Sequence, residues 1–292
     1  MTPWDYALRY LPIKVPGPTN ALRINVSRYH LGDPTAAQQQ LLGAVIDHFG
    51  SKQRKDPSYR LKLTVNDAPL EIASRQEISR SLQVPFLGKG SPEDCQIVLQ
   101  LALLVGGISP DKLQAWTDAN LGLDCNGFVG NYLFHEVQQK GWRLDPAKTD
   151  VGPSTTIDVY FQRWAEAPID DLSKIQPGRM HLIVRVDDNG RVIPRFSGSK
   201  VGHIAITQPG EVMNQSFVYD SMGGLDLQTA QLGMYGKLAL RTVESGGPVD
   251  GVGKNWLVFI KPTKLKAVFE VNRDKIHMVD KIMVAPLRAK PL

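Results

Sequence analysis

The stretch RMHLIVRVDDNGRVIPRF, residues 179–196, marks the point at which the chain changes from helical to strand patterning. Its two apolar runs flank DDNG, and an Asn-Gly turn between such runs is typical of a β-hairpin. Further apolar segments follow, separated by turns rich in Gly and Pro: HIAIT (203–207), SFVYDSM (216–222), KLALRTV (237–243), NWLVFIKP (255–262), LKAVFEV (265–271) and KIMVAPL (281–287). We therefore expect helices first and then a run of antiparallel strands, which is an α+β plan.

Helical patterns dominate the part of the chain before this stretch. DPTAAQQQLLGAVIDHFG (33–50) predicts a helix that Gly50 ends, and GSPEDCQIVLQLALLVGG (90–107) predicts one that starts at Ser91. The second is apolar nearly all round, so we expect it inside a core. Residues 1–90 show no chemistry and are interpreted as an N-terminal accessory region of unknown role, which leaves residues 91–292 as the main domain.

Composition excludes several classes of function. The chain has 292 residues with 34 Lys+Arg against 29 Asp+Glu, a net charge of +5, and no long basic run, so nucleic acid is not an expected partner. No apolar stretch reaches the roughly 18 residues of a membrane span. The N-terminus lacks the apolar core of a signal peptide, which predicts cytoplasmic synthesis. With two cysteines and no C-x-x-C or H-E-x-x-H motif, we expect neither a disulfide framework, nor a metal, nor another cofactor.

The segment GLDCNGFVGNYLF (122–134) carries the strongest chemical signal. Cys125 falls at the start of a predicted helix, where backbone N–H groups and the helix dipole favour the thiolate, which is the nucleophilic form. The backbone N–H groups at Cys125 and Asn126 could hold an oxyanion, with Asp124 and Gly127 as supporting residues. A packed cysteine beneath a helix cap is the alternative, and it is the interpretation we favour for Cys95.

A nucleophilic cysteine needs a base, and His203 is the predicted one. The segment KVGHIAIT (200–207) places it at the first residue of an apolar strand, directly after a glycine. A strand end is a rigid mount that can still reach a cleft. His135 lies ten residues after Cys125 on the same predicted helix, about 15 Å away, and is excluded as its partner.

Three segments in this order resemble one family. GLDCNGFVG is similar to the D-C-S-G-F/L-V helix start of NlpC-type cell-wall peptidases, IQPGRMHLI (175–183) to their P-G-D strand start, and VGHIAIT (201–207) to the histidine strand of NlpC and CHAP domains. The resemblance covers roughly residues 91–262, although Asn126 and Arg179 depart from the pattern. It implies a papain-like (NlpC/CHAP-type) core of helix plus antiparallel sheet, and a third residue after the histidine. Asp220 is favoured for that role and Tyr219 is the alternative.

The same resemblance implies a cysteine hydrolase that cleaves an amide bond in bacterial peptidoglycan, as a stem-peptide endopeptidase or a muramoyl-alanine amidase. Such a protein could be a secreted effector or a phage lysin, delivered to the periplasm or outside by a non-classical route, with an immunity protein as a partner. Two alternatives stay open. One is a protein-modifying toxin, a glutamine deamidase or acyltransferase with the same Cys-His-Asp site. The other is a non-catalytic binding module.

Overall fold

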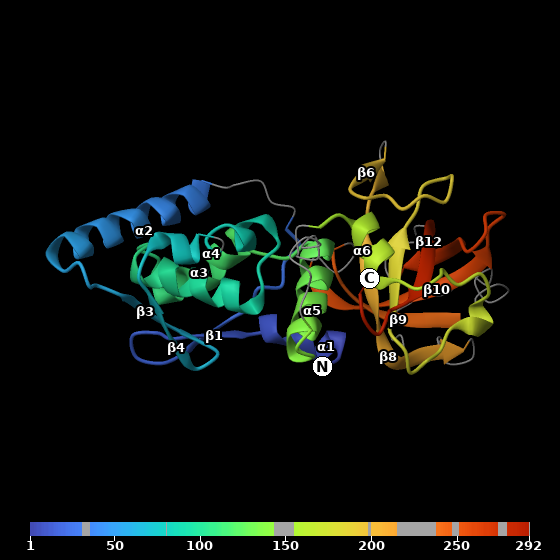
Figure 1. The fold of residues 1–292 in the computed structure, drawn as a ribbon, viewed down its shortest axis with the longest axis horizontal. Coiled ribbons are helices and arrows are strands. Elements are labelled where there is room, and N and C mark those ends of the chain that lie inside the picture. Colours follow the sequence, from blue (N-terminus) through green and yellow to red (C-terminus); the bar gives the residue numbers. More distant parts are fainter. Residues whose placement is uncertain are drawn as a thin grey trace. The chain divides into compact units, whose positions relative to one another are not determined.

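The computed structural model describes residues 1–30, 36–79, 81–142, 155–197, 200–214, 238–246, 251–273 and 279–291 (Figure 1). Two compact units make up the chain. The helical unit comprises Tyr6–Asn131 with Ser245–Val252, and the barrel unit comprises Met1–Asp5, Tyr132–Glu244 and Gly253–Leu292. Residues 6–90 therefore share a unit with residues up to 131, and the predicted domain boundary at residue 90 stays a prediction.

The helical unit is built around one buried helix, α3. Its elements are η1 (Leu8–Tyr10), β1 (Ile13–Val15), β2 (Leu22–Ile24), α2 (Ala36–Lys55), β3 (Leu61–Val65), β4 (Ala68–Ile72), η2 (Arg75–Ile78), η3 (Val84–Leu87), α3 (Pro92–Leu104), η4 (Pro110–Lys112) and α4 (Leu113–Asn120). α3 contacts β1, β3, α2, α4 and η3, and its residues from Cys95 to Ala102 are buried. Ser91 caps it in a reciprocal capping box with Asp94. The predicted start and burial of this helix are confirmed.

Helix α2 is longer than its sequence pattern predicts. The pattern ends the helix at Gly50, but α2 continues to Lys55. A glycine costs about 1 kcal/mol in a helix interior, which neighbouring interactions can offset. Here Lys52, Arg54 and Lys55 occupy the last turn, where cations interact favourably with the helix dipole.

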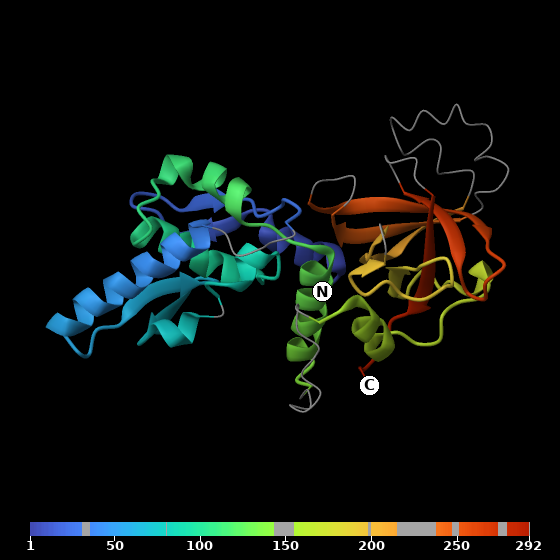
Figure 2. The same cartoon turned by 90° about the horizontal axis from the view of Figure 1, so that it is seen from above.

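The barrel unit contains most of the strands that the sequence predicts, and its strands form a closed antiparallel barrel (Figure 2). The predicted strand SFVYDSM (216–222) lies outside the described residues. The barrel order is β10-β11-β12-β5-β8-β9. The bounds are β5 (His181–Arg185), β8 (Ile204–Asn214), β9 (Leu238–Ser245), β10 (Val252–Pro262), β11 (Phe269–Arg273) and β12 (Val279–Pro286), with a separate ribbon of β6 (Phe196–Ser197) and β7 (Lys200–Val201). The unit also holds α6 (Ile157–Trp164) and η6 (Leu172–Lys174), while α1 (Pro3–Ala7) and α5 (Cys125–Gln139) cross from one unit into the other.

The closed barrel corrects the predicted fold class. The papain-like core of helix plus antiparallel sheet is wrong for this chain, because the barrel dominates its C-terminal part. An apolar face that curls into a barrel fills its own interior and leaves no unpaired edge strand. Side chains of the barrel strands form one apolar cluster with two residues that precede β5, Ile169 and Ile175. The strand residues of this cluster are Ile183, Ala205, Leu240, Leu257, Phe259, Phe269, Val271, Ile282 and Val284.

The DDNG turn forms as predicted, but the segments on its two sides are paired only by one isolated β-bridge. Val186 bridges Val192, and Gly190 has a φ of 76°, a backbone conformation that glycine adopts without strain. The long partners of β5 are instead β12 and β8, both distant in sequence. No helix among the described residues is long and apolar enough to cross a membrane.

Candidate active site

One end of the barrel interior is polar. Side chains two residues apart on a strand face the same side, and each polar side chain here lies two residues from an apolar side chain of the barrel core. The pairs are Arg185 after Ile183, His203 before Ala205, Thr242 after Leu240, Asn255 before Leu257 and Asp280 before Ile282. Neighbouring strands of the barrel are antiparallel, so a residue after the core position on one strand and a residue before it on the next lie at the same end of the barrel. The polar cluster therefore draws on five strands or their ends.

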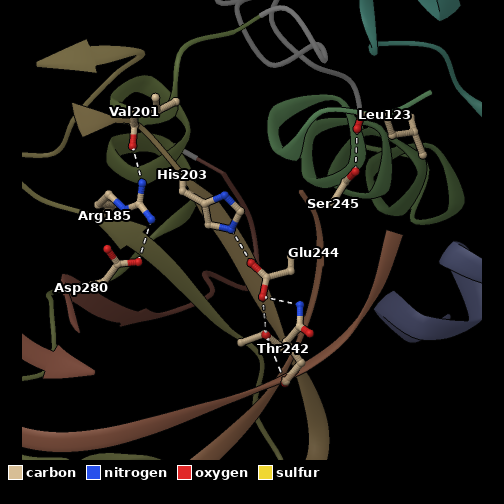
Figure 3. A network of polar contacts seen from close by, with 9 residues as sticks. Leu123, Arg185, Val201, His203, Thr242, Glu244, Ser245 and Asp280 are labelled. Carbon is tan, nitrogen blue, oxygen red and sulfur yellow. Dashed lines mark hydrogen bonds and ion pairs between the residues drawn. The ribbon is translucent and has the colours of Figure 1, made fainter. Parts of the chain in front are cut away.

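His203 and Glu244 form the centre of this cluster (Figure 3). The two residues are 7% and 2% exposed, and His203 Nε2 is hydrogen-bonded to Glu244 Oε2. The register that pairs Thr207 with Thr242 continues to Ala205 opposite Glu244, which makes His203 a diagonal neighbour of Glu244. Long side chains reach across such a diagonal.

The second carboxylate oxygen of Glu244 is also held. Asn255 Nδ2 donates to Glu244 Oε1 over 2.9 Å, and the Thr242 hydroxyl lies 3.1 Å from the same oxygen. The Thr242 hydroxyl also lies 3.2 Å from the Asn255 carbonyl oxygen, and its single proton serves one of the two acceptors at a time. Buried carboxylates need such partners, because an uncompensated charge in a protein interior is costly. Glu244 is therefore held as an acceptor for the imidazole N–H.

His203 occupies the strand end that the sequence predicts. It directly precedes β8, and Gly202 before it is packed so tightly that an added Cβ would lie 2.3 Å from the Ile193 carbonyl oxygen. The glycine is thus required for the backbone to approach this closely. His203 sits at a fixed position on the barrel rather than on a free loop.

Cys125 is the first residue of α5, as the sequence predicts, and is 6% exposed. Asp124 caps the helix: its Oδ1 accepts the Gly127 N–H, and its carbonyl accepts the Phe128 N–H. Lys89 Nζ lies 2.5 Å from Asp124 Oδ2, so the capping carboxylate, on the residue before Cys125, has a positive partner.

The supporting residues lie where the helix start meets a neighbouring loop. An added Cβ on Gly127 would lie 1.9 Å from the Gly88 carbonyl oxygen, so its bare backbone accommodates that loop. Asn126 is in the first turn of α5, where helical N–H groups lack intrahelical partners. Cys125 belongs to the helical unit and His203 to the barrel unit, and their pairing stays a prediction.

Asp220 and Tyr219, the two predicted third residues, lie outside the described residues. Glu244 was missed by the sequence reasoning, although its place at alternate positions with Leu240 and Thr242 is a readable signal for an inward-facing acid. The buried Nε2 of His181, on β5, has no hydrogen-bond partner among the described residues. Burial lowers the pKa of His181 to about 4, so its ring is neutral at pH 7.

The polar cluster joins an imidazole to a carboxylate, two groups that can exchange a proton. Within the described ranges, no group of three or more His, Cys, Asp or Glu side chains is arranged to hold a metal ion.

Comparisons with protein-family models, with curated proteins and with solved structures gave no match.

Proposed function

We propose that the protein is a cysteine hydrolase that cleaves an amide bond, with Cys125 as nucleophile, His203 as general base and acid, and Glu244 as the residue that orients His203. The observation that carries this proposal is the buried His203–Glu244 pair, with Glu244 Oε1 held by Asn255 and Thr242. A carboxylate that binds one imidazole nitrogen selects the tautomer in which the other nitrogen is the base. Glu244 accepts the Nε2 proton, which leaves Nδ1 to act as base.

The proposed reaction has two halves. Nδ1 takes the proton of the Cys125 thiol, and the thiolate attacks the amide carbonyl carbon. Backbone N–H groups at the start of α5, those of Cys125 and Asn126, bind the oxyanion of the tetrahedral intermediate. The C–N bond breaks as Nδ1 returns the proton to the leaving amine, and a thioester remains on Cys125.

Water completes the second half. Nδ1 removes one proton from a water molecule, whose oxygen attacks the thioester carbon. The C–S bond breaks, the thiol regains its proton, and a carboxylic acid leaves. Glu244 stabilises the imidazolium form of His203 in both halves.

Two adjacent residues, Glu244 and Ser245, bind one residue each in the two units: Glu244 binds His203, and Ser245 binds Leu123. Ser245, which follows Glu244 directly, donates its hydroxyl to the Leu123 carbonyl over 2.6 Å (Figure 3). Leu123 precedes Cys125 by two residues.

The proposed substrate class is peptidoglycan, on the strength of the three segments that resemble cell-wall peptidases. Purified sacculi incubated with the full chain should release fragments with new amine and carboxyl termini, detected by mass spectrometry. Cys125→Ala and His203→Ala should abolish release, whereas Cys95→Ala is the matched cysteine control and should keep it.

A parallel incubation with protein extract separates the alternatives. Deamidated or acylated proteins, together with intact sacculi, would indicate a protein-modifying toxin. If neither material changes while the protein still sediments with sacculi, a binding module replaces the hydrolase.

A further inference from the structure

The backbone on both sides of Gly202 is held from one residue on the neighbouring strand, Arg185. The Arg185 backbone N–H donates to the His203 carbonyl over 3.0 Å, and Arg185 Nη1 donates to the Val201 carbonyl over 2.8 Å. Between them, the Gly202 N–H donates to the Arg195 carbonyl over 2.7 Å. The backbone groups of three successive residues, Val201 to His203, are therefore hydrogen-bonded, and Arg185 is the donor in two of the three bonds.

Asp280 in turn holds Arg185. Its Oδ2 lies 2.7 Å from Arg185 Nη2, and the side chains of the two residues are 11% and 22% exposed (Figure 3). A guanidinium group is planar and presents its N–H donors in fixed directions, so binding Nη2 to Asp280 also fixes the direction of Nη1 toward Val201. This ion pair is less exposed than the Lys281–Asp188 pair, in which the Asp188 side chain is 69% exposed.

Strand register builds this arrangement. Ile183 pairs with Ala205 on β8, and the same register brings Arg185 opposite His203. Arg185 also pairs with Ile282 on β12, two residues from Asp280. Directly opposite residues face the same side of a sheet, so Arg185, His203 and Asp280 share the inward face.

We propose that Arg185 and Asp280 are positioning residues that set the orientation of the His203 ring. The effect of this positioning on catalysis rests on the proposed function, in which His203 is the general base. Glu244 fixes the ring at Nε2, while Arg185 fixes the backbone that carries the ring. Together they determine where Nδ1 points, and proton transfer depends on that placement.

The test uses the full chain with two variants and one control. Asp280→Asn keeps the shape of the side chain but weakens its hold on Arg185, and Arg185→Lys replaces the planar fork by a single ammonium group. Asp188→Asn removes an ion pair from the same strand pairing at an exposed position and is the matched control. NMR of the ring nitrogens and carbons of His203 should show broadened or doubled signals in the first two variants and native signals in the control.

Activity and stability are measured in the same samples. We expect kcat on sacculi to fall on the order of 10- to 100-fold in both variants with KM unchanged, because the base is displaced while substrate binding is kept. Native His203 signals and native kcat in both folded variants would overturn the proposal. Altered His203 signals in a protein that never cleaves sacculi would uphold the positioning role and refute the hydrolase.

Discussion

Replacing Glu244 by Gln reverses the tautomer of His203, and the surrounding donors determine how. Asn255 Nδ2 and the Thr242 hydroxyl both approach the Oε1 position, so the Gln amide places its carbonyl oxygen there. Its NH₂ group then faces His203 Nε2, which must become the acceptor. In the neutral ring the proton moves to Nδ1, the nitrogen that the proposed mechanism needs as a base.

The expected cost is large in rate and small in stability. Loss of the correct tautomer and of the charge that stabilises imidazolium should lower kcat on the order of 10⁴-fold. The amide keeps the contacts at the Oε1 position, so the free energy of unfolding should fall by only about 1–2 kcal/mol. Release of soluble fragments from sacculi gives kcat, long-range ¹⁵N NMR gives the tautomer, and urea unfolding gives stability. A folded Glu244→Gln variant with near-native kcat and the proton still on Nε2 would refute the reasoning.

Three further predictions concern the thiols and a second histidine. Iodoacetamide at pH 7 should label Cys125 long before Cys95, whose thiol pKa burial raises well above its ordinary value, and faster labelling of Cys95 would contradict this. Lys89→Met should slow labelling of Cys125 several-fold, because the negative charge of Asp124, the residue before Cys125, loses its positive partner and disfavours the thiolate. An unchanged labelling rate would exclude this electrostatic role. His181 has a folded pKa of about 4 against 6.5 unfolded, so its contribution to stability is present above pH 6.5 and is lost as the pH falls toward 4. When the pH is lowered from 7.5 to 5, the unfolding free energy of the native chain should fall by about 2 kcal/mol more than that of His181→Phe. Urea titration measures both values, and equal losses would show that His181 is not the cause.

Local patterns predicted individual elements well. The helix start at Ser91 and the apolar run after it predict α3, since both signals act within one or two turns. Asp124 and Gly127 mark the start of α5 in the same way. The inward alternation of β9 also predicts a strand, because its period is a property of consecutive residues.

Barrel closure and the His203–Glu244 pair depend on contacts between distant residues. β5 pairs with β12, which lies about a hundred residues later in the chain. The turn signal at DDNG is local and cannot predict this distant strand pairing. Glu244 lies 41 residues after His203. An inward-facing acid in the sequence indicates that the carboxylate needs a buried partner, but it does not indicate which residue that partner is. The expected fold followed three short motifs, whereas strand pairing at both edges of the sheet determines the architecture.

The most direct test of the central claim is the mass of the covalent intermediate. Native protein mixed with soluble muropeptides, quenched in acid within the first turnovers and digested, should yield the peptide containing Cys125 with an acyl group attached through a thioester. The adduct should be absent from Cys125→Ala and from the peptide containing Cys95. Hydrolysed product without any adduct on Cys125, or undiminished product from Cys125→Ala, would contradict the assignment of Cys125 as the nucleophile.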